Sequence, residues 1–69
     1  MPLSLVEAGK SYIVRQISGR SEVRSHLEGL GLVPGCEVTV ISKNQGGVII
    51  NVRESRVALA KDMARKVLV

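Results

Sequence analysis

The side chains that could carry nucleophilic or metal chemistry are few in this chain. It has one histidine, His26, and one cysteine, Cys36. A nucleophile needs a base that a further group orients, and a closed zinc site needs about four such donors at short spacing. We therefore expect no intrinsic cofactor, with His26 exposed at the surface or half covered and Cys36 as a small buried residue. Binding of Fe2+ or another transition metal by either residue is the alternative, and a site completed by a second copy or a partner stays open.

Carboxylate and phosphate chemistry also lack a motif. The six acidic residues are scattered among basic ones, so no pair of carboxylates is set apart for general acid–base catalysis. Gly46-Gly47 does not belong to the Gly-x-x-x-x-Gly-Lys-Ser/Thr pattern that holds phosphates, and it predicts a loop. From these absences we predict that the protein is not an enzyme.

Positive charge is the remaining chemical feature. The net charge is +4, and the basic excess lies mainly in the second half of the chain. The cations that could gather there on one basic edge are Arg53, Arg56, Lys61, Arg65 and Lys66. A solvated rim explains them simply, while docking on an acidic protein surface is the functional interpretation.

The same charge would suit nucleic acid, and a nucleic-acid-associated module is the alternative to a protein-binding one. Tyr12 is the only aromatic residue in the chain. Single strands are usually held by bases stacked on aromatic rings. We therefore expect no nucleic-acid partner.

A helix is predicted just before the middle of the chain. Val23, Leu27 and Leu30 recur at helical spacing, and Ser21 is the expected N-cap. Gly31 follows where a helix commonly ends in a left-handed residue. The helix would therefore run from Ser21 to about Leu30.

A tight turn and a strand follow that helix. Pro34-Gly35 suits the two central positions of a type II turn, because proline fixes φ and glycine accepts a positive φ. Val38 and Val40 then alternate with polar residues, as on a half-buried strand. A helix, a tight turn and a strand in direct succession are expected where a helix is inserted between the strands of a very small barrel.

Short alternating segments elsewhere predict the rest of the barrel. Ile13 and Ile17 are expected to point inward from the first strand, although Arg15 shares their parity. The predicted strands cover 11–17, 37–42, 48–52, 56–59 and 66–69, with a helical turn over 60–65. Strands of this number and spacing predict one mainly β domain over residues 1–69, a small and partly open barrel.

No apolar run is long enough to span a bilayer, and the first residues lack a secretion signal. We therefore expect a cytoplasmic protein without direct membrane insertion. An exposed Ile49 or an unpaired end strand would support self-association.

Nearly the whole chain, in order, is similar to the FeoA family. The residues that carry the resemblance begin with Leu5, Gly9 and Arg24, continue through Leu30-Gly31-Leu32 and Pro34-Gly35, and end with Val57-Ala58-Leu59, Ala64, Val67 and Val69. Two loops depart from the family pattern, at Gly46-Gly47 and at Glu54-Ser55, where relatives often have Gly-Pro and a glycine. The resemblance implies an SH3-like barrel of about five strands with one inserted helix and a short C-terminal helical turn.

The resemblance also implies a role and a partner. FeoA proteins are small cytoplasmic components of bacterial ferrous iron uptake, thought to bind or modulate FeoB, a large membrane iron transporter with a cytoplasmic GTP-binding domain. The same barrel occurs as a domain of iron-dependent repressors. We expect partner contacts at the helix and the following turn, through Arg24, Leu30, Leu32, Val33 and Pro34. Core packing is the competing explanation for Leu30 and Leu32.

Overall fold

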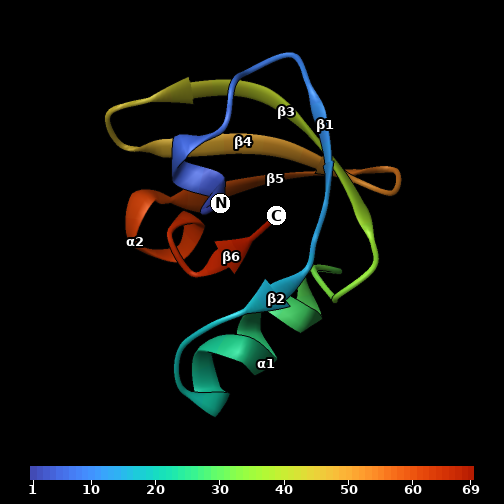
Figure 1. Ribbon diagram of the computed structural model, residues 1–69, viewed down its shortest axis with the longest axis vertical. Coiled ribbons are helices and arrows are strands. Elements are labelled where there is room, and N and C mark those ends of the chain that lie inside the picture. The colour runs from blue at the N-terminus through green and yellow to red at the C-terminus, as the bar shows by residue number, and fades with distance from the viewer.

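Two antiparallel sheets form the fold, seen in a computed structural model that describes all 69 residues (Figure 1). In chain order the elements are a 3-10 helix η1 (Leu3–Leu5), β1 (Ser11–Ile13), β2 (Gln16–Ile17), α1 (Ser21–Gly29), β3 (Glu37–Asn44), β4 (Gly47–Val52), β5 (Ser55–Ala60), α2 (Lys61–Ala64) and β6 (Val67–Leu68). The larger sheet has the order β1-β3-β4-β5, and the smaller one pairs β2 with β6. The protein is therefore mainly β, with six strands and two α-helices.

The extra strand arises because the predicted first strand is divided between the two sheets. The backbone N–H of Val14 donates to Cys36 at 2.9 Å, whereas that of Arg15 donates to Leu68 at 2.7 Å. The chain thus leaves β1 and enters β2 within two residues, and the alternation of side chains is reset. Val14 is buried, and Ile13, expected to point inward, is 52% exposed. Arg15 lies in the connection outside both strands, so it is exposed, while Ile17 of β2 is buried as predicted.

The core is a single cluster of apolar side chains enclosed by the two sheets, η1 and α2. Val38 and Val40 of β3 are fully buried, as their alternation predicted. Their neighbours in β4 face the same way, and the members of this strand in the core are Val48, Ile50 and Val52. Every buried side chain is apolar, so the barrel is held by burial of hydrocarbon and by its backbone ladders.

The β3–β4 hairpin turns tightly at Gln45-Gly46. Asn44 Oδ1 accepts hydrogen bonds from the backbone N–H groups of Gly46 at 2.8 Å and Gly47 at 3.0 Å. A Cβ at position 47 would overlap the carbonyl oxygen of Leu59 in β5. Glycine is required here because two backbones pass each other at that point.

The two ends of the chain lie side by side (Figure 1). The amino group of Met1 donates to the Val69 carbonyl oxygen at 2.9 Å, and the Val69 N–H donates to the Met1 carbonyl oxygen at 2.8 Å. An isolated bridge joins Pro2 to Leu68 in the same place. The first and last residues therefore continue the pairing of the small sheet.

Candidate docking surface

Helix α1 projects from the barrel (Figure 1). Leu27 is its one buried residue, while Val23 packs partly against the core. The helix begins at Ser21, and the N-cap is Arg20 rather than Ser21. No side chain caps the helix, so the prediction of Ser21 as an N-cap is wrong. Most of the surface of α1 is left open to solvent.

The C-terminal end of α1 is fixed by a complete Schellman motif. Gly31 has φ of +98°, as the sequence predicted. Its N–H donates to the Glu28 carbonyl oxygen at 2.9 Å, and the N–H of Leu32 donates to the Leu27 carbonyl oxygen at 3.0 Å. These two bonds are the pair that defines the motif, and they return the chain to the barrel at Leu32.

The next four residues form the predicted turn. Gly35 has φ of +94°, and the Cys36 N–H donates to the Val33 carbonyl oxygen at 3.1 Å, as a type II turn requires. The Gly35 N–H also donates to the Val14 carbonyl oxygen at 2.7 Å. The turn is therefore tied to the connection between β1 and β2 and presents a fixed shape.

The expected contact residues divide into exposed and buried ones. Arg24 and Pro34 are exposed, and Leu30 and Val33 are half-buried. Leu32 is fully buried in the core, so it cannot contact a partner and the packing explanation is the right one for it. An accessible surface remains on α1 and its turn, made of Arg24, Leu30, Val33 and Pro34.

The five cations predicted to share a basic edge do not gather. Arg53 and Arg56 flank the start of β5, whereas Lys61 lies beyond its end. Six strand residues separate the two ends, a span of roughly 20 Å at about 3.3 Å per residue. Arg65 is paired with Asp62 at 2.8 Å, and Lys66 lies beside β2, where its carbonyl oxygen accepts from the Ser18 N–H at 2.8 Å. The prediction fails because the length of β5 keeps its two ends apart.

The two candidate metal donors belong to different environments. His26 is exposed on α1, and Cys36 is half-buried after the turn as a free thiol. No three His, Cys, Asp or Glu side chains come together in a way that could hold a metal ion. Cys36 shares a shallow hollow with Glu37, Thr39, Asn51 and Arg53 on the outer face of the large sheet.

The one carboxylate with a perturbed pKa belongs to a surface ion pair. Glu7 Oε2 lies 2.9 Å from Lys10 Nζ, and both side chains are exposed. The hydrogen bond from Lys10, and then its charge, lower the pKa of Glu7. Glu7 in turn raises the pKa of Lys10. Both groups are charged at neutral pH, which suits a stabilised turn rather than proton transfer.

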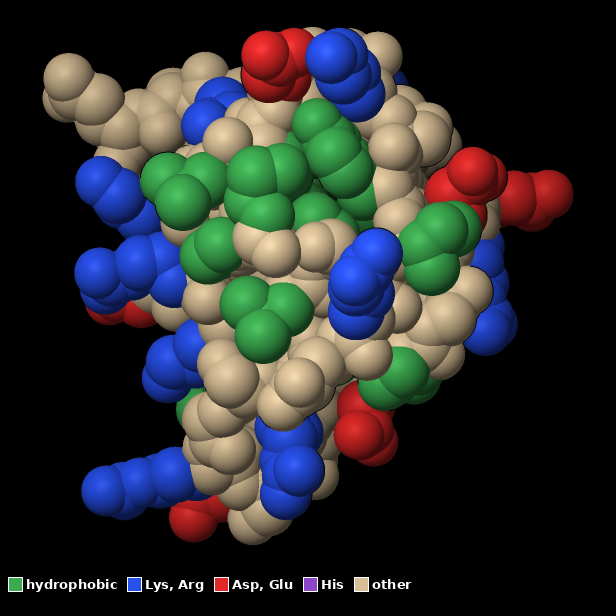
Figure 2. All heavy atoms as spheres, in the orientation of Figure 1, with side chains coloured by type: hydrophobic (Ala, Val, Ile, Leu, Met, Phe, Trp, Pro, Cys, Tyr) green, Lys and Arg blue, Asp and Glu red, His purple; other side chains and the backbone are tan.

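The large apolar side chains that are exposed lie outside α1 and its turn, where the sequence predicted partner contacts. Leu5 is 67% exposed and Ile41 is 40% exposed, while Ile49 is half-buried. Figure 2 shows hydrophobic side chains gathered over the part of the molecule where η1 and the chain ends lie. The spacing of Leu3 and Val6 could have indicated this, because residues three apart share a face of a 3-10 helix, which leaves Leu5 outside. No helix has both the length and the apolar character needed to cross a bilayer.

Comparison with known proteins agrees with the geometry. The family model described as the FeoA domain matches residues 1–69. The chain is 29% identical to a Methanocaldococcus jannaschii protein described as a candidate Fe(2+) transport protein A, over 99% of this chain and 83% of that protein. A crystal structure of an iron uptake regulatory protein, FeoA, superposes with a TM-score of 0.89 at 37% identity, covering 97% of this chain and 91% of the other.

Two further structures define how widely the fold occurs. The FeoA of Stenotrophomonas maltophilia, crystallised with zinc and described as an SH3 domain protein, is 26% identical with a TM-score of 0.85 over 99% of this chain and 87% of that one. A manganese-dependent transcriptional repressor shares the fold, with a TM-score of 0.90 at 16% identity over 97% of this chain and 39% of the other. The expected SH3-like barrel is thereby confirmed, and the chain belongs to the FeoA family.

Proposed function

We propose that this protein is a cytoplasmic accessory component of ferrous iron uptake that binds the GTP-binding region of a FeoB-like membrane transporter and modulates it. The supporting observation is the match of the FeoA domain over the whole chain. The name of the Methanocaldococcus jannaschii relative points to the same process. In this proposal the protein acts by contact, as a regulatory partner without chemistry of its own.

The proposed contact surface is the open side of α1 with the turn after it. Arg24 supplies a charge on the helix, and the half-buried Val33 supplies an apolar group beside Pro34. The Schellman motif and the bond from Gly35 to Val14 hold the helix end and the turn in one arrangement. A surface that is already ordered loses little conformational entropy when it binds. If this surface binds one conformation of the partner more tightly than another, binding shifts the partner toward that conformation.

The test is a titration of the purified protein against the soluble GTP-binding region of the cognate transporter, with GTP and with GDP. We expect saturable binding and a changed GTPase rate. Arg24→Glu and Val33→Asp should each weaken binding by about tenfold, as loss of a central contact often does. Arg56→Glu makes the same charge change on β5, outside α1 and its turn, and should leave binding unaltered.

Two results would count against the proposal. If neither nucleotide state binds and the GTPase rate is unchanged, the protein is not a partner of that region. If Arg56→Glu weakens binding as much as Arg24→Glu does, the contact does not lie on α1.

A further inference from the structure

Strand β5 ends the large sheet and leaves one side of its backbone unpaired. It is the last strand in the order β1-β3-β4-β5. Its partner β4 is joined to it by a two-residue turn, and Val52 pairs with Ser55 across that turn. The hydrogen-bonded pairs of the ladder therefore fall on every second residue from Ser55 onward. The bond from the Lys61 N–H to the Gly46 carbonyl oxygen at 3.2 Å continues the same phase.

This phase directs the amides and carbonyls of Arg56, Ala58 and Ala60 away from β4. All three residues are exposed. None of the backbone hydrogen bonds outside the helices and strands involves them, and the Ala60 carbonyl, at the N-cap of α2, is the acceptor for the first turn of that helix. The edge is also without a proline, and the register shift of the sheet lies on β3, between Val40 and Ser42. Proline and bulges are common ways by which proteins close such an edge, so β5 is an open template.

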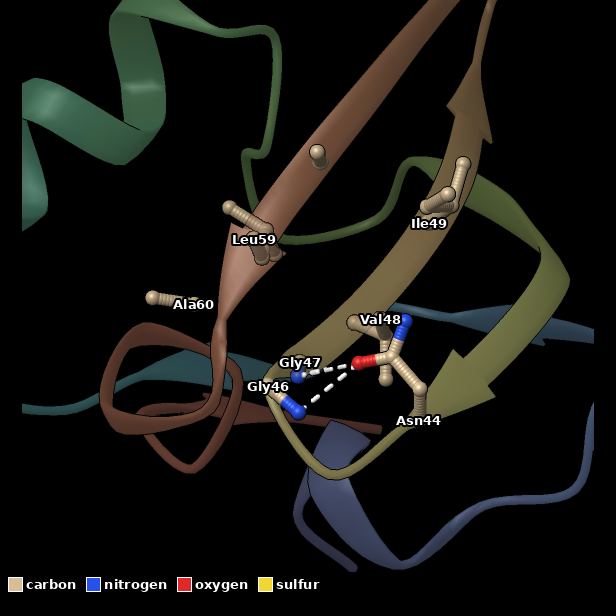
Figure 3. A pocket seen from close by; sticks show the side chains of 8 residues that line it. Asn44, Gly46, Gly47, Val48, Ile49, Leu59 and Ala60 are labelled. Carbon is tan, nitrogen blue, oxygen red and sulfur yellow. Dashed lines mark hydrogen bonds between the residues drawn. The ribbon is translucent and has the colours of Figure 1, made fainter.

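The shape beside this edge suits another strand. Ala58 and Ala60 have small side chains, so a second backbone can approach closely. A hollow of about 300 Å³ lies next to them, at the point where the β3–β4 turn meets the end of β5, and Figure 3 shows the residues that line it. Ile49 and the two glycines of that turn line it on the other side. An apolar side chain of an added strand would be received there.

Positive charge marks both ends of the edge. Arg56 lies near its start and Lys61 follows its end. Lys61 also lines a smaller hollow together with Lys43, Ser4 and Asn44, and no carboxylate lines either hollow. None of these three cations forms a salt bridge, because the two ion pairs of the protein use Lys10 and Arg65. Figure 2 shows Lys and Arg side chains along the side of the molecule where α2 and the β3–β4 turn lie.

The charge decides which occupant fits. A second copy pairing through its own β5 would bring cations against cations, and like charges on adjacent strands oppose pairing. An acidic chain would meet Arg56 and Lys61 at the ends of the edge with opposite charge. We propose that β5 binds an extended acidic peptide segment as an added strand, with carboxylates facing Arg56 and Lys61 and an apolar side chain in the hollow. This mode is β-strand addition, and it uses a surface separate from α1, so it stands independently of the transporter contact.

The probe is a capped octapeptide that alternates glutamate with valine, added to the 15N-labelled protein. We expect the largest NMR shifts at the amides of Arg56, Ala58 and Ala60. Binding should weaken several-fold when salt rises from about 0.05 to 0.5 M, because exposed charges are screened. A peptide of the same length that alternates lysine with valine is the matched control and should not bind.

Two variants and one modified peptide locate the contact. Ala58→Pro removes an N–H that points away from β4, so the ladder stays intact while strand addition is lost by at least tenfold. The double variant Arg56→Glu and Lys61→Glu should lose binding by a similar factor, whereas Arg20→Glu should not. Methylating alternate peptide nitrogens blocks the same backbone bonds without altering the protein, which keeps the test valid if Ala58→Pro fails to fold.

Three outcomes would overturn the inference: no binding of the acidic peptide at low salt, equal binding of the lysine peptide, or shifts centred on α1. In the first case Arg56 and Lys61 serve only to keep the open edge from pairing with other copies.

Discussion

Arg53 occupies a backbone conformation that an arginine rarely adopts, and replacing it with glycine should stabilise the protein. Its φ is +57°, the one positive value outside the glycines, and it sits first in the two-residue turn between β4 and β5. A left-handed conformation costs an L-residue about 1–2 kcal/mol. Glycine avoids that cost but loses about 0.5–1 kcal/mol through the greater freedom of its unfolded chain. We therefore expect Arg53→Gly to gain about 0.5–1 kcal/mol in the free energy of unfolding.

The measurement is urea unfolding of the wild type and three variants, with the midpoint and the slope fitted separately. For a domain of this size, the expected gain corresponds to a rise of roughly 2–8 °C in Tm, and the slope should not change. Arg53→Asn should fall between wild type and glycine, because asparagine tolerates the left-handed region. Arg53→Ala removes the same side chain and keeps the backbone cost. If Arg53→Gly is no more stable than Arg53→Ala, strain at this turn is not the cause and the reasoning is refuted.

Three other predictions concern the fold and its surface pair. Gly47→Ala should destabilise the protein by about 2–4 kcal/mol in chemical unfolding, because its Cβ would overlap the Leu59 carbonyl oxygen; Gly29→Ala, whose Cβ meets nothing within 4 Å, is the control and should be neutral or stabilising. Leu27→Ala removes the one buried side chain of α1 and should lower the free energy of unfolding by about 2–5 kcal/mol. Hydrogen exchange should speed up more in α1 than in β3. Equal acceleration in both elements would show that α1 does not detach from the barrel on its own. Because the pKa of Glu7 is lowered and that of Lys10 is raised in the folded protein, their ion pair stabilises the fold at pH values between the ordinary pKa values of the two groups. The stabilisation is lost as pH falls through the folded pKa of Glu7 or rises through the folded pKa of Lys10. NMR titration of the Glu7 carboxyl should show a lowered pKa that rises in Lys10→Met; an unchanged value would exclude Lys10 as the cause.

Local geometry was the part of the fold most open to prediction from the sequence. Gly31 and Pro34-Gly35 act through their own backbone preferences, so the helix end and the turn were both predicted correctly. Val38 and Val40 followed from simple alternation, since one face of β3 is buried. Signals of this kind need no knowledge of distant residues.

Features that depend on distant partners were not predictable in the same way. The break between β1 and β2 carries no glycine or proline, and it exists because Val14 and Arg15 bond to different strands. The basic residues were grouped by closeness in sequence, yet β5 places Arg56 and Lys61 at opposite ends. The open edge of β5 is likewise invisible in the sequence, because only the strand order shows which strand lacks a neighbour.

The pairing of Met1 with Val69 has a consequence for how this protein can be rearranged. Because the ends meet, a short linker could join them, and the chain could be reopened at Gln45 in the exposed β3–β4 turn with every strand kept in place. A domain built in this way can also be inserted into an exposed loop of another protein without separating the two flanks of that loop. The contacts between elements thus run on from Val69 to Met1, so the fold does not depend on which residue comes first in the chain.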